Sequence, residues 1–345
     1  MLYVGLDLSR KRLDWQALDQ AGEQVAVGAA PPDRDGLAQL ARRLGDCEIV
    51  AVIESMSGAR FVHDELERWG WDVRVADASK ARGIAPLACK TDRIDCWVLA
   101  ELARRDLVPE VWLPDAAVRA ERERARFRLY LVRHRVSLKN RVHAILFQHG
   151  IPVAHSDLFG AAGRRTLERL RLPEPWQSTV CCSLELIDTL NTEIRDCERE
   201  LKRLGADHPY VSRLVTCPGI GPVLAYTIAS EIGDIARFQS PRKLVGYTGL
   251  CPRVDQSGER DRRGALRKNG PTYLRWALIE AAHVAVRCYP PYRELAETMR
   301  DRHGRARGGN IAAVETGRRL SEAIWHMLTN DQPFAPAGAR YRLAA

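Results

Sequence analysis

The first hundred residues alternate between the two-residue period of strands and the wider spacing of helices. Apolar runs predict five strands, at Leu2–Leu8, Leu13–Leu18, 24–29, Ile49–Glu54 and Asp72–Ala76. Short turns separate the first three, which predicts an antiparallel meander. Apolar positions three and four residues apart predict helices at 33–44, 61–69 and 91–105.

Three strands followed by helix, strand, helix, strand and helix is the order of the RNase H-like fold. We therefore predict an α/β domain over residues 1–110, ending near Pro109 and Pro114.

The segment 119–141 carries nine Lys or Arg and two Glu with no Pro or Gly, which predicts a long basic helix. Such a helix presents either a solvated face or a nucleic-acid contact. We predict the contact, through Arg119, Arg122, Arg126, Arg133, Lys139 and Arg141.

Apolar residues from Val180 to Leu204 follow steps of three and four, close to a heptad seam. The seam packs against the basic helix or against another subunit, and the sequence does not choose between them. The Gly- and Pro-containing segment 150–175 is predicted to be a connector.

Residues from Val211 onward are predicted to be mostly helical with two Gly-rich interruptions. We thus expect an α/β plus α protein with three further parts: a helical, coiled-coil region over 115–207, a mostly helical domain over 208–329, and a flexible tail over 330–345.

The composition indicates which class of molecule the protein binds. The 345 residues carry a formal net charge of +9, which favours a polyanion such as nucleic acid. No apolar run reaches the roughly 18–20 residues of a membrane span, and the first residues lack the basic region of a signal peptide. Nine cysteines without CxxC spacing are typical of reduced thiols. We expect a cytoplasmic protein with no membrane partner.

Four carboxylates occupy positions that suit a metal-dependent nuclease. Asp7 and Glu54 end two apolar runs, and Asp92 and Asp95 lie three residues apart on one face of a predicted helix. Carboxylate oxygens bind hard cations such as Mg²⁺ or Mn²⁺, and paired ions serve in-line phosphoryl displacement. The alternative is that these are capping or surface acids.

Two further motifs bear on phosphate chemistry. Gly219 and Gly221, in a Pro-Gly-Ile-Gly-Pro stretch before a predicted helix, resemble the turn of a helix-hairpin-helix element and can let backbone amides approach a phosphate. The alternative is a simple helix-breaking turn.

Ser257 precedes Gly258 in a basic loop, where it can act as a nucleophile if it is activated. Neighbouring arginines and a lysine can hold the attacked phosphate: Arg260, Arg262, Arg263, Arg267 and Lys268. The alternative is an ordinary Ser-Gly turn.

Taken together, these motifs resemble those of the IS110 family of insertion-sequence transposases, the DEDD recombinases related to Piv-type DNA invertases. The resemblance covers nearly the whole chain. Gly5-Leu6-Asp7, Ile53-Glu54-Ser55 and Lys90-Thr91-Asp92-Arg93-Ile94-Asp95 match its acidic motifs, and Ser257-Gly258 matches its serine motif. Two positions depart from it: Pro271 after Gly270, and Glu259-Arg260-Asp261 after the serine motif.

The resemblance implies a RuvC-like domain that holds Mg²⁺ on Asp7, Glu54, Asp92 and Asp95. It also implies a coiled-coil insertion and Ser257 as the nucleophile of a covalent phosphoserine. The implied partners are donor and target DNA, a structured noncoding guide RNA, and further copies of the chain in a homodimer or homotetramer.

Other functions stay open at this point. The same acids can activate water, as in a junction resolvase, or serve an RNA-independent DNA invertase. A non-enzymatic nucleic-acid scaffold and a tyrosine recombinase using Tyr247 or Tyr273 are weaker candidates, because all four acids are present and no Arg/His/Lys constellation accompanies the tyrosines.

Overall fold

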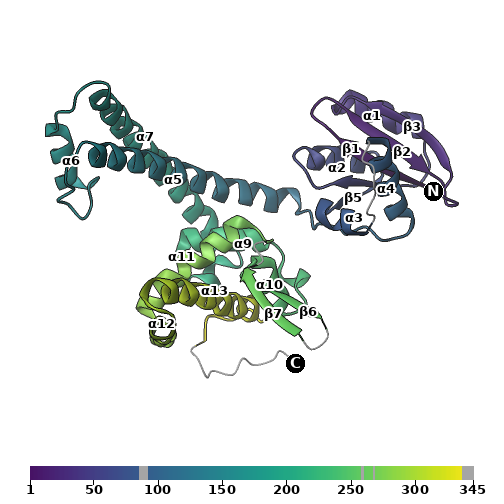
Figure 1. The fold of residues 1–345 in the computed structure, drawn as a ribbon. Helices are drawn as coiled ribbons and strands as arrows, with labels where there is room; N and C mark the ends of the chain where they lie inside the picture. Colours follow the sequence, from purple (N-terminus) through teal and green to yellow (C-terminus); the bar gives the residue numbers. More distant parts are fainter. Residues whose placement is uncertain (85–91, 258–259, 267–268, 336–345) are drawn as a thin grey trace. The chain divides into compact units, whose positions relative to one another are not determined.

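The computed structural model describes residues 1–84, 92–257, 260–266 and 269–335, of which 92–93, 253–257 and 260–263 are described by their backbone alone. The chain divides into two compact units, Met1–Pro114 and Asp115–Ala345 (Figure 1). No helix in these described segments is both long and apolar enough to cross a membrane.

The first unit contains a five-stranded sheet whose strand order is β3-β2-β1-β4-β5. Strands β1, β2 and β3 form an antiparallel meander, whereas β1, β4 and β5 run parallel. The strands are β1 (Leu2–Leu8), β2 (Leu13–Leu18), β3 (Gln24–Ala30), β4 (Ile49–Glu54) and β5 (Asp72–Ala76). The predicted meander and all five predicted strands are confirmed, with β3 one residue longer than expected.

Four helices accompany this sheet: α1 (Arg34–Leu44), α2 (Ala59–Arg68), α3 (Ala78–Ile84) and α4 (Asp92–Arg104). The short helix α3 was not predicted, because its seven residues carry a single buried side chain, Ala81, and so no helical period. Asp33 caps α1 by accepting a 2.8 Å hydrogen bond from the Gly36 amide.

The two faces of the sheet pack against different helices. Val4, Leu6 and Leu8 of β1 point into a core with residues of α1 and α2 such as Leu37 and Leu66. On the other face, Val50 and Val52 of β4 pack with Leu99 and Ala103 of α4. Because side chains alternate along a strand, the odd-numbered residues of β1 and the even-numbered residues of β4 lie under α4.

Helix α4 is held close to this face at two points. A Cβ on Gly5 would lie 1.8 Å from the Cys96 carbonyl oxygen, so only glycine allows the helix to approach β1 this closely. At the other end of α4, Glu101 accepts hydrogen bonds from Arg104 and Arg105, which lower the pKa of its carboxyl to about 2. Arg104 also donates to the Gln20 carbonyl, 3.3 Å away.

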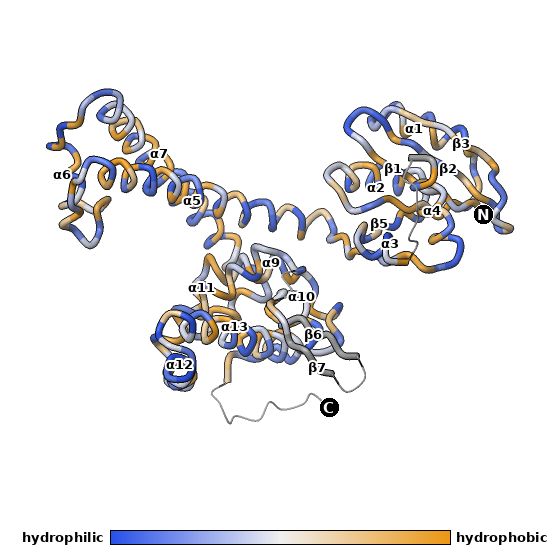
Figure 2. The backbone as a smooth tube through the Cα atoms, viewed as in Figure 1, coloured by the Kyte–Doolittle hydropathy of each residue, from blue (hydrophilic) through white to orange (hydrophobic). Residues whose placement is uncertain are grey.

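The second unit begins with a pair of long helices, α5 (Ala116–Gln148) and α7 (Trp176–Ala206). Between them lies α6 (Ala161–Arg169), a helix in the segment predicted to be only a connector. The apolar seam of α7 packs within the chain: Val180, Leu184 and Ile187 share a core with Val142 and Ile145 of α5. Polar and apolar positions alternate along α5 (Figure 2).

The rest of this unit is a helical domain with one hairpin. Its elements are α8 (Val211–Leu214), α9 (Pro222–Ile232), the 3₁₀ turn η1 (Ile235–Arg237), α10 (Pro241–Thr248), β6 (Pro252–Ser257), β7 (Arg260–Leu266), α11 (Thr272–Cys288), α12 (Pro290–His303) and α13 (Arg305–Thr329). Its core joins α9, α11 and α13 through fully buried residues such as Ile228, Leu278 and Leu320.

The antiparallel hairpin β6–β7 corrects the prediction of a loop around Ser257. Its sequence, Pro-Arg-Val-Asp-Gln-Ser and Arg-Asp-Arg-Arg-Gly-Ala-Leu, lacks the apolar alternation that marks a strand.

The segment after α13 contacts the helical domain. The Phe334 ring lies 5.6 Å from that of Tyr289, and its amide donates a 2.8 Å hydrogen bond to Thr216. Asp331 pairs with Arg213 at 3.1 Å. The remainder of the predicted tail, residues 336–345, lies outside the described part of the chain.

Candidate metal centre and nucleophile

Asp7 and Glu54 lie side by side at the carboxyl ends of two parallel strands. The register pairs Leu6 with Ile53, so Asp7 and Glu54 are the next residues along β1 and β4. Asp7 shares a face of β1 with Gly5, which contacts α4, and Glu54 shares a face of β4 with Val52, which also packs against α4. Both carboxylates are partly exposed beneath that helix.

Helix α4 brings the other two acids to the same side of the sheet. Asp95 lies one turn before Leu99, which is buried against β4, and residues four apart share a helix face. Asp92 is the first residue of α4, three positions before Asp95, and its side chain lies outside the described residues. The backbone thus puts Asp7 and Glu54 at the carboxyl ends of β1 and β4, and Asp92 and Asp95 at the start of the helix that covers this face of the sheet.

The structure adds a fifth acid, Asp14, to this edge. Asp14 pairs directly with Asp7 across the antiparallel strands β1 and β2. Arg12 donates to its carboxylate at 2.9 and 2.6 Å. The predicted meander already made β2 the neighbour of β1, and the hairpin register was the signal that could have identified Asp14.

The negative charges of these acids affect the pKa of the buried Cys96 thiol. Burial raises the pKa of Cys96 to about 12, and the negative charges of Asp7, Asp14 and Asp95 add to the rise.

The donor set suits a hard divalent cation, since it consists of carboxylate oxygens that are partly open to solvent. Among the side chains that the structure describes, no three His, Cys, Asp or Glu residues come close enough to bind a metal. Asp7, Glu54 and Asp95 are among these side chains and do not form such a group in this structure, while the side chain of Asp92 lies outside the described residues.

Ser257 is the last residue of strand β6. It pairs with Arg260, and Asp255 pairs with Arg262 two residues further along each strand. Arg263 pairs with Val254. Arg267 and Lys268 lie outside the described residues, and the side chains of Ser257 and the three β7 arginines are not described either.

The base of the hairpin is fixed by close backbone contacts. A Cβ on Gly270 would lie 1.8 Å from the Tyr247 carbonyl oxygen, and Gly249 adopts a positive φ of 70°. Arg275 links the residues before β6 to those after β7. Its guanidinium donates to the carbonyls of Thr248 at 3.5 Å and Gly270 at 3.4 Å. This bracing orients the strand that carries Ser257.

Two of the predicted nucleic-acid contacts point into the protein instead. Arg122 is 8% exposed and donates to the carbonyls of Ser230 and Glu231, at 2.9 and 2.7 Å. Arg126 binds both oxygens of the fully buried Glu231 carboxylate, at 2.7 and 2.9 Å, which raises the pKa of Arg126. These two arginines join α5 to α9. The spacing of charges along α5 could not show which side of the helix faces the protein core.

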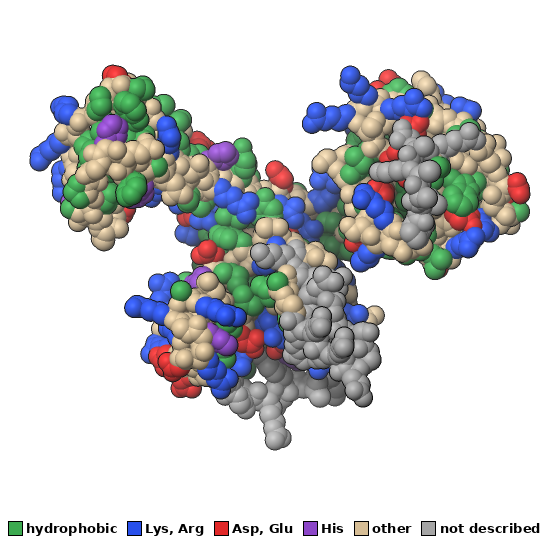
Figure 3. Space-filling model, viewed as in Figure 1, with side chains coloured by type: hydrophobic (Ala, Val, Ile, Leu, Met, Phe, Trp, Pro, Cys, Tyr) green, Lys and Arg blue, Asp and Glu red, His purple; other side chains and the backbone are tan. Residues whose placement is uncertain are grey.

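The other basic residues of α5 divide between partners and solvent. Arg133 lies 5.2 Å from the Tyr273 ring, and Lys139 lies 4.7 Å from that of Phe159. Arg141 is exposed and Arg119 is partly exposed. Figure 3 shows Lys and Arg side chains at the surface along α5. The prediction of a nucleic-acid contact on α5 therefore depends on Arg119, Arg133, Lys139 and Arg141.

Gly219 and Gly221 differ in their surroundings. Gly219 has a φ of 81°, and a Cβ there would lie 2.2 Å from the Ala281 carbonyl oxygen, so this glycine packs against α11. Gly221 caps α9 with open space around its Cα. Of the two glycines, Gly221 is the one with room for a phosphate to approach its backbone.

Comparison with known proteins now fixes the family. A model described as a transposase of the DEDD IS110 type matches residues 4–151, which include β1, β4 and α4. A second, described as the transposase IS116/IS110/IS902 family, matches residues 211–297, which include the Ser257 hairpin. The chain belongs to the IS110 family of transposases.

Two relatives match this IS110 transposase along nearly its whole length. One, from Pseudomonas aeruginosa, is named a probable family 20 transposase and is 26% identical over 96% of this chain and 98% of its own. The transposase for insertion element IS1328 of Yersinia enterocolitica is 27% identical over the same shares. The pilin gene-inverting protein of Moraxella bovis is 31% identical over 36% of this chain and 38% of its own.

Family membership makes this chain a DNA recombinase or transposase, an enzyme that acts on DNA. The DEDD class depends in general on divalent metal ions, and Asp7 and Glu54 lie at the carboxyl ends of the adjacent parallel strands β1 and β4.

Proposed function

We propose that this IS110 transposase cuts and rejoins DNA through Ser257, with a divalent metal held by Asp7, Glu54, Asp92 and Asp95. The observation that carries the proposal is the pairing of Asp7 and Glu54 on adjacent parallel strands beneath the helix that presents Asp95. Element order and strand order in this unit support an RNase H-like, RuvC-like fold.

The chemistry is a transesterification. The Ser257 hydroxyl oxygen forms a bond to the phosphorus, the bond to the 3′ oxygen breaks, and the hydroxyl proton passes to that leaving oxygen. The phosphoserine keeps the bond energy, so a second 3′ hydroxyl can attack it and rejoin the strands without an external energy source. Mg²⁺ or Mn²⁺, when bound, stabilises the charge on the attacked phosphate.

The protein contributes position and charge. Arg260 and Arg262 lie opposite Ser257 and Asp255 in the hairpin, so β7 can bring guanidinium groups to the phosphate that Ser257 attacks. Arg12 pairs with Asp14 beside Asp7, which offsets part of the negative charge next to the four proposed metal-binding acids.

The acids and the serine belong to different units, Met1–Pro114 and Asp115–Ala345. We infer that they act on one phosphate when nucleic acid is bound, within a subunit or between subunits of a homodimer or homotetramer. Exchange of two duplexes requires several such centres.

We further propose that a structured noncoding RNA guides the enzyme to donor and target DNA. Family membership and the net charge of +9 support this. Base pairing by that RNA would set the DNA sequence, as in other RNA-guided enzymes.

The decisive assay is recombination with guide RNA and both DNAs supplied, for wild type, Ser257→Ala and Asp7→Ala. Both variants are expected to be inactive, and wild type is expected to yield a protein–DNA adduct that maps to Ser257. Full recombination by either variant would refute the mechanism.

A hydrolytic nuclease is the second candidate, because the same acids can activate water. It predicts metal-dependent cleavage that Ser257→Ala retains, with no covalent adduct. An RNA-independent invertase, to which the likeness to the pilin gene-inverting protein points, predicts full recombination by protein freed of RNA.

A further inference from the structure

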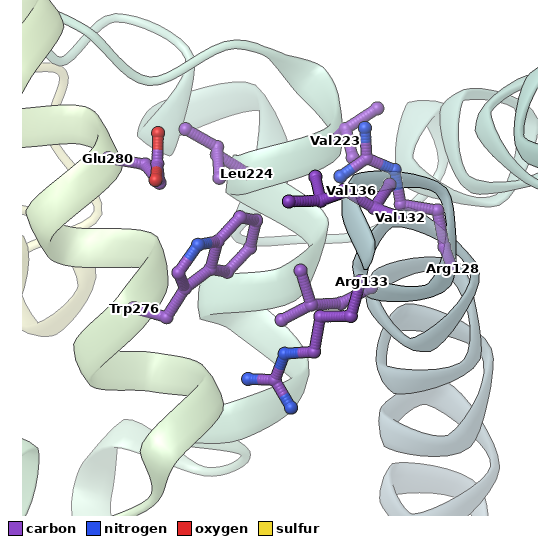
Figure 4. Close-up of a pocket in the computed structure, with 9 residues that line it drawn as sticks. Arg128, Val132, Arg133, Val136, Val223, Leu224, Trp276 and Glu280 are labelled. Atoms are coloured by element: carbon purple, nitrogen blue, oxygen red, sulfur yellow. The ribbon is translucent and has the colours of Figure 1, made fainter. Parts of the chain in front are cut away.

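A pocket of about 520 Å³ lies between α5, α9 and α11, all within the second unit. Its walls are mostly apolar, and three ionisable groups stand among them (Figure 4). The lining residues are Arg128, Leu129, Val132, Arg133, Val136, Val223, Leu224, Trp276 and Glu280. Its volume falls within the roughly 300–1,000 Å³ of small-ligand sites.

Trp276 provides a flat aromatic surface inside this pocket. Figure 4 shows its indole between Leu224 of α9 and Arg133 of α5. The ring is partly buried against the core of the helical domain, which restricts its rotation, while the rest of it faces the pocket. A fixed, half-open indole flanked by valine and leucine is a surface on which another planar ring can stack.

Glu280 lies one turn after Trp276 on α11, so the two side chains share a helix face. Glu280 is exposed, and its carboxylate can accept hydrogen bonds from the edge of a ring that is stacked on the indole. Exocyclic amino groups of nucleobases are such donors.

Arg133 supplies positive charge at the opposite side of the indole. Its guanidinium lies 5.2 Å from the Tyr273 ring and is exposed. Arg128, the other cation, is engaged with Glu198 of α7, so Arg133 is the residue whose charge faces an occupant. An anionic group attached to the stacked ring would meet this guanidinium.

A planar ring with amino groups and an attached phosphate is a nucleotide. A purely apolar occupant, such as a helix of another protein, would bury Arg133 and Glu280 without satisfying their charges, which is costly. The combination of an indole, a carboxylate and an exposed guanidinium therefore favours a nucleotide over an apolar segment.

We propose that this pocket binds one unpaired nucleobase of the nucleic acid on which the enzyme acts, stacked on Trp276 and held at its edge by Glu280. The proposal rests on the nucleic-acid function proposed above and adds a site to it. The base can belong to the guide RNA or to a displaced DNA strand, because both carry the same chemistry.

Photo-crosslinking of the full-length protein with guide RNA and both DNAs tests this directly. The photoreactive bases keep the exocyclic amino group that Glu280 would bind: 5-iodocytosine replaces cytosine and 8-azidoadenine replaces adenine, in the RNA in one arm and in the DNA in the other. A crosslink to Trp276 in the RNA arm assigns the base to the guide, and one in the DNA arm assigns it to a DNA strand.

Complexes that form with wild-type affinity but give no crosslink to the lining residues in either arm would overturn the pocket proposal alone. Failure of the protein to bind either nucleic acid would overturn it together with the proposed function, so the two failures are distinguishable.

Variants give a second measurement. Trp276→Ala is expected to weaken binding of the crosslinked strand roughly 5- to 150-fold through loss of base stacking, and Trp276→Phe is expected to restore most of it. Trp69→Ala removes a tryptophan that is 46% exposed on the other unit and is the matched control. Glu280→Gln is expected to reduce the preference for amino-bearing bases.

Thermal melting of the Trp276 variants shows whether a loss of binding comes from a loss of folding. Trp276→Phe keeps an aromatic ring in place, so it is the variant in which folding should be least affected. If Trp276→Ala changes the oligomeric mass and leaves strand affinity intact, the pocket is an interface between copies and the proposal is wrong.

Discussion

Gly5→Ala is the sharpest test of how β1 and α4 position the acids. The added Cβ would lie 1.8 Å from the Cys96 carbonyl oxygen and 2.8 Å from the Ala100 amide nitrogen, against an ordinary contact of 3.4–4 Å. Both neighbours are backbone atoms of α4, so neither can rotate away. The helix must move off the strand, and Asp92 and Asp95 must move with it.

The size of the effect follows from overpacking a buried contact. Such insertions cost about 1–3 kcal/mol, which for a unit of this size lowers the melting temperature by about 4–8 °C per kcal/mol. A displacement of about 1 Å at a catalytic centre can reduce the rate about 100-fold. We expect a less stable first unit and, below its melting temperature, severely reduced DNA cleavage.

The assay is thermal melting and metal-dependent DNA cleavage of the full chain, with Gly83→Ala as the matched control. Gly83 lies on α3 in the same unit, and a Cβ there meets nothing within 4 Å. The control should be as stable as wild type and as active. Wild-type melting and cleavage by Gly5→Ala would show that α4 does not lie on β1 as described.

Three further predictions concern residues away from that contact. Arg126→Met removes two hydrogen bonds from the buried Glu231 carboxylate and leaves it facing Arg122 at 3.8 Å, which is expected to cost about 2 kcal/mol of stability. The exposed Arg141→Met should stay within about 0.5 kcal/mol, and equal denaturation midpoints would refute the structural role of Arg126. The depressed pKa of Glu101 contributes stability above its ordinary value of 4.5 that is lost as pH falls toward about 2. Glu101→Gln should therefore be less stable than wild type at pH 7, with the difference in unfolding free energy vanishing near pH 2. Because its pKa is raised to about 12, Cys96 should resist a thiol reagent at pH 8 that labels the exposed cysteines, and rapid labelling of Cys96 in the folded protein would contradict its burial.

The catalytic candidates came from patterns that are local in the sequence. A continuous apolar run ends at Asp7 and another at Glu54, and residue spacing puts Asp92 and Asp95 on one helix face. Such patterns specify elements because burial repeats with the geometry of the backbone. They also predicted the meander, and with it most of the first unit.

The roles of charged and small residues could not be read in this way. Arg122 and Arg141 look alike within one basic helix, yet one is buried against the carbonyls of α9 and the other is exposed. Gly219 and Gly221 belong to one motif, but only the first is pressed against α11. The hairpin at Ser257 was missed because its strands have polar residues where alternation would signal burial.

The sequence by itself therefore determined the five strands and most helices of the first unit, the four candidate acids and the family resemblance, since each depends on residues close together in the chain. The tertiary structure decided what depends on long-range contacts. It placed Asp14 beside Asp7, turned Arg122 and Arg126 inward, and enclosed Trp276 in a pocket built from three helices. Which face of a helix is buried is set by its packing partners, and those are distant in the sequence.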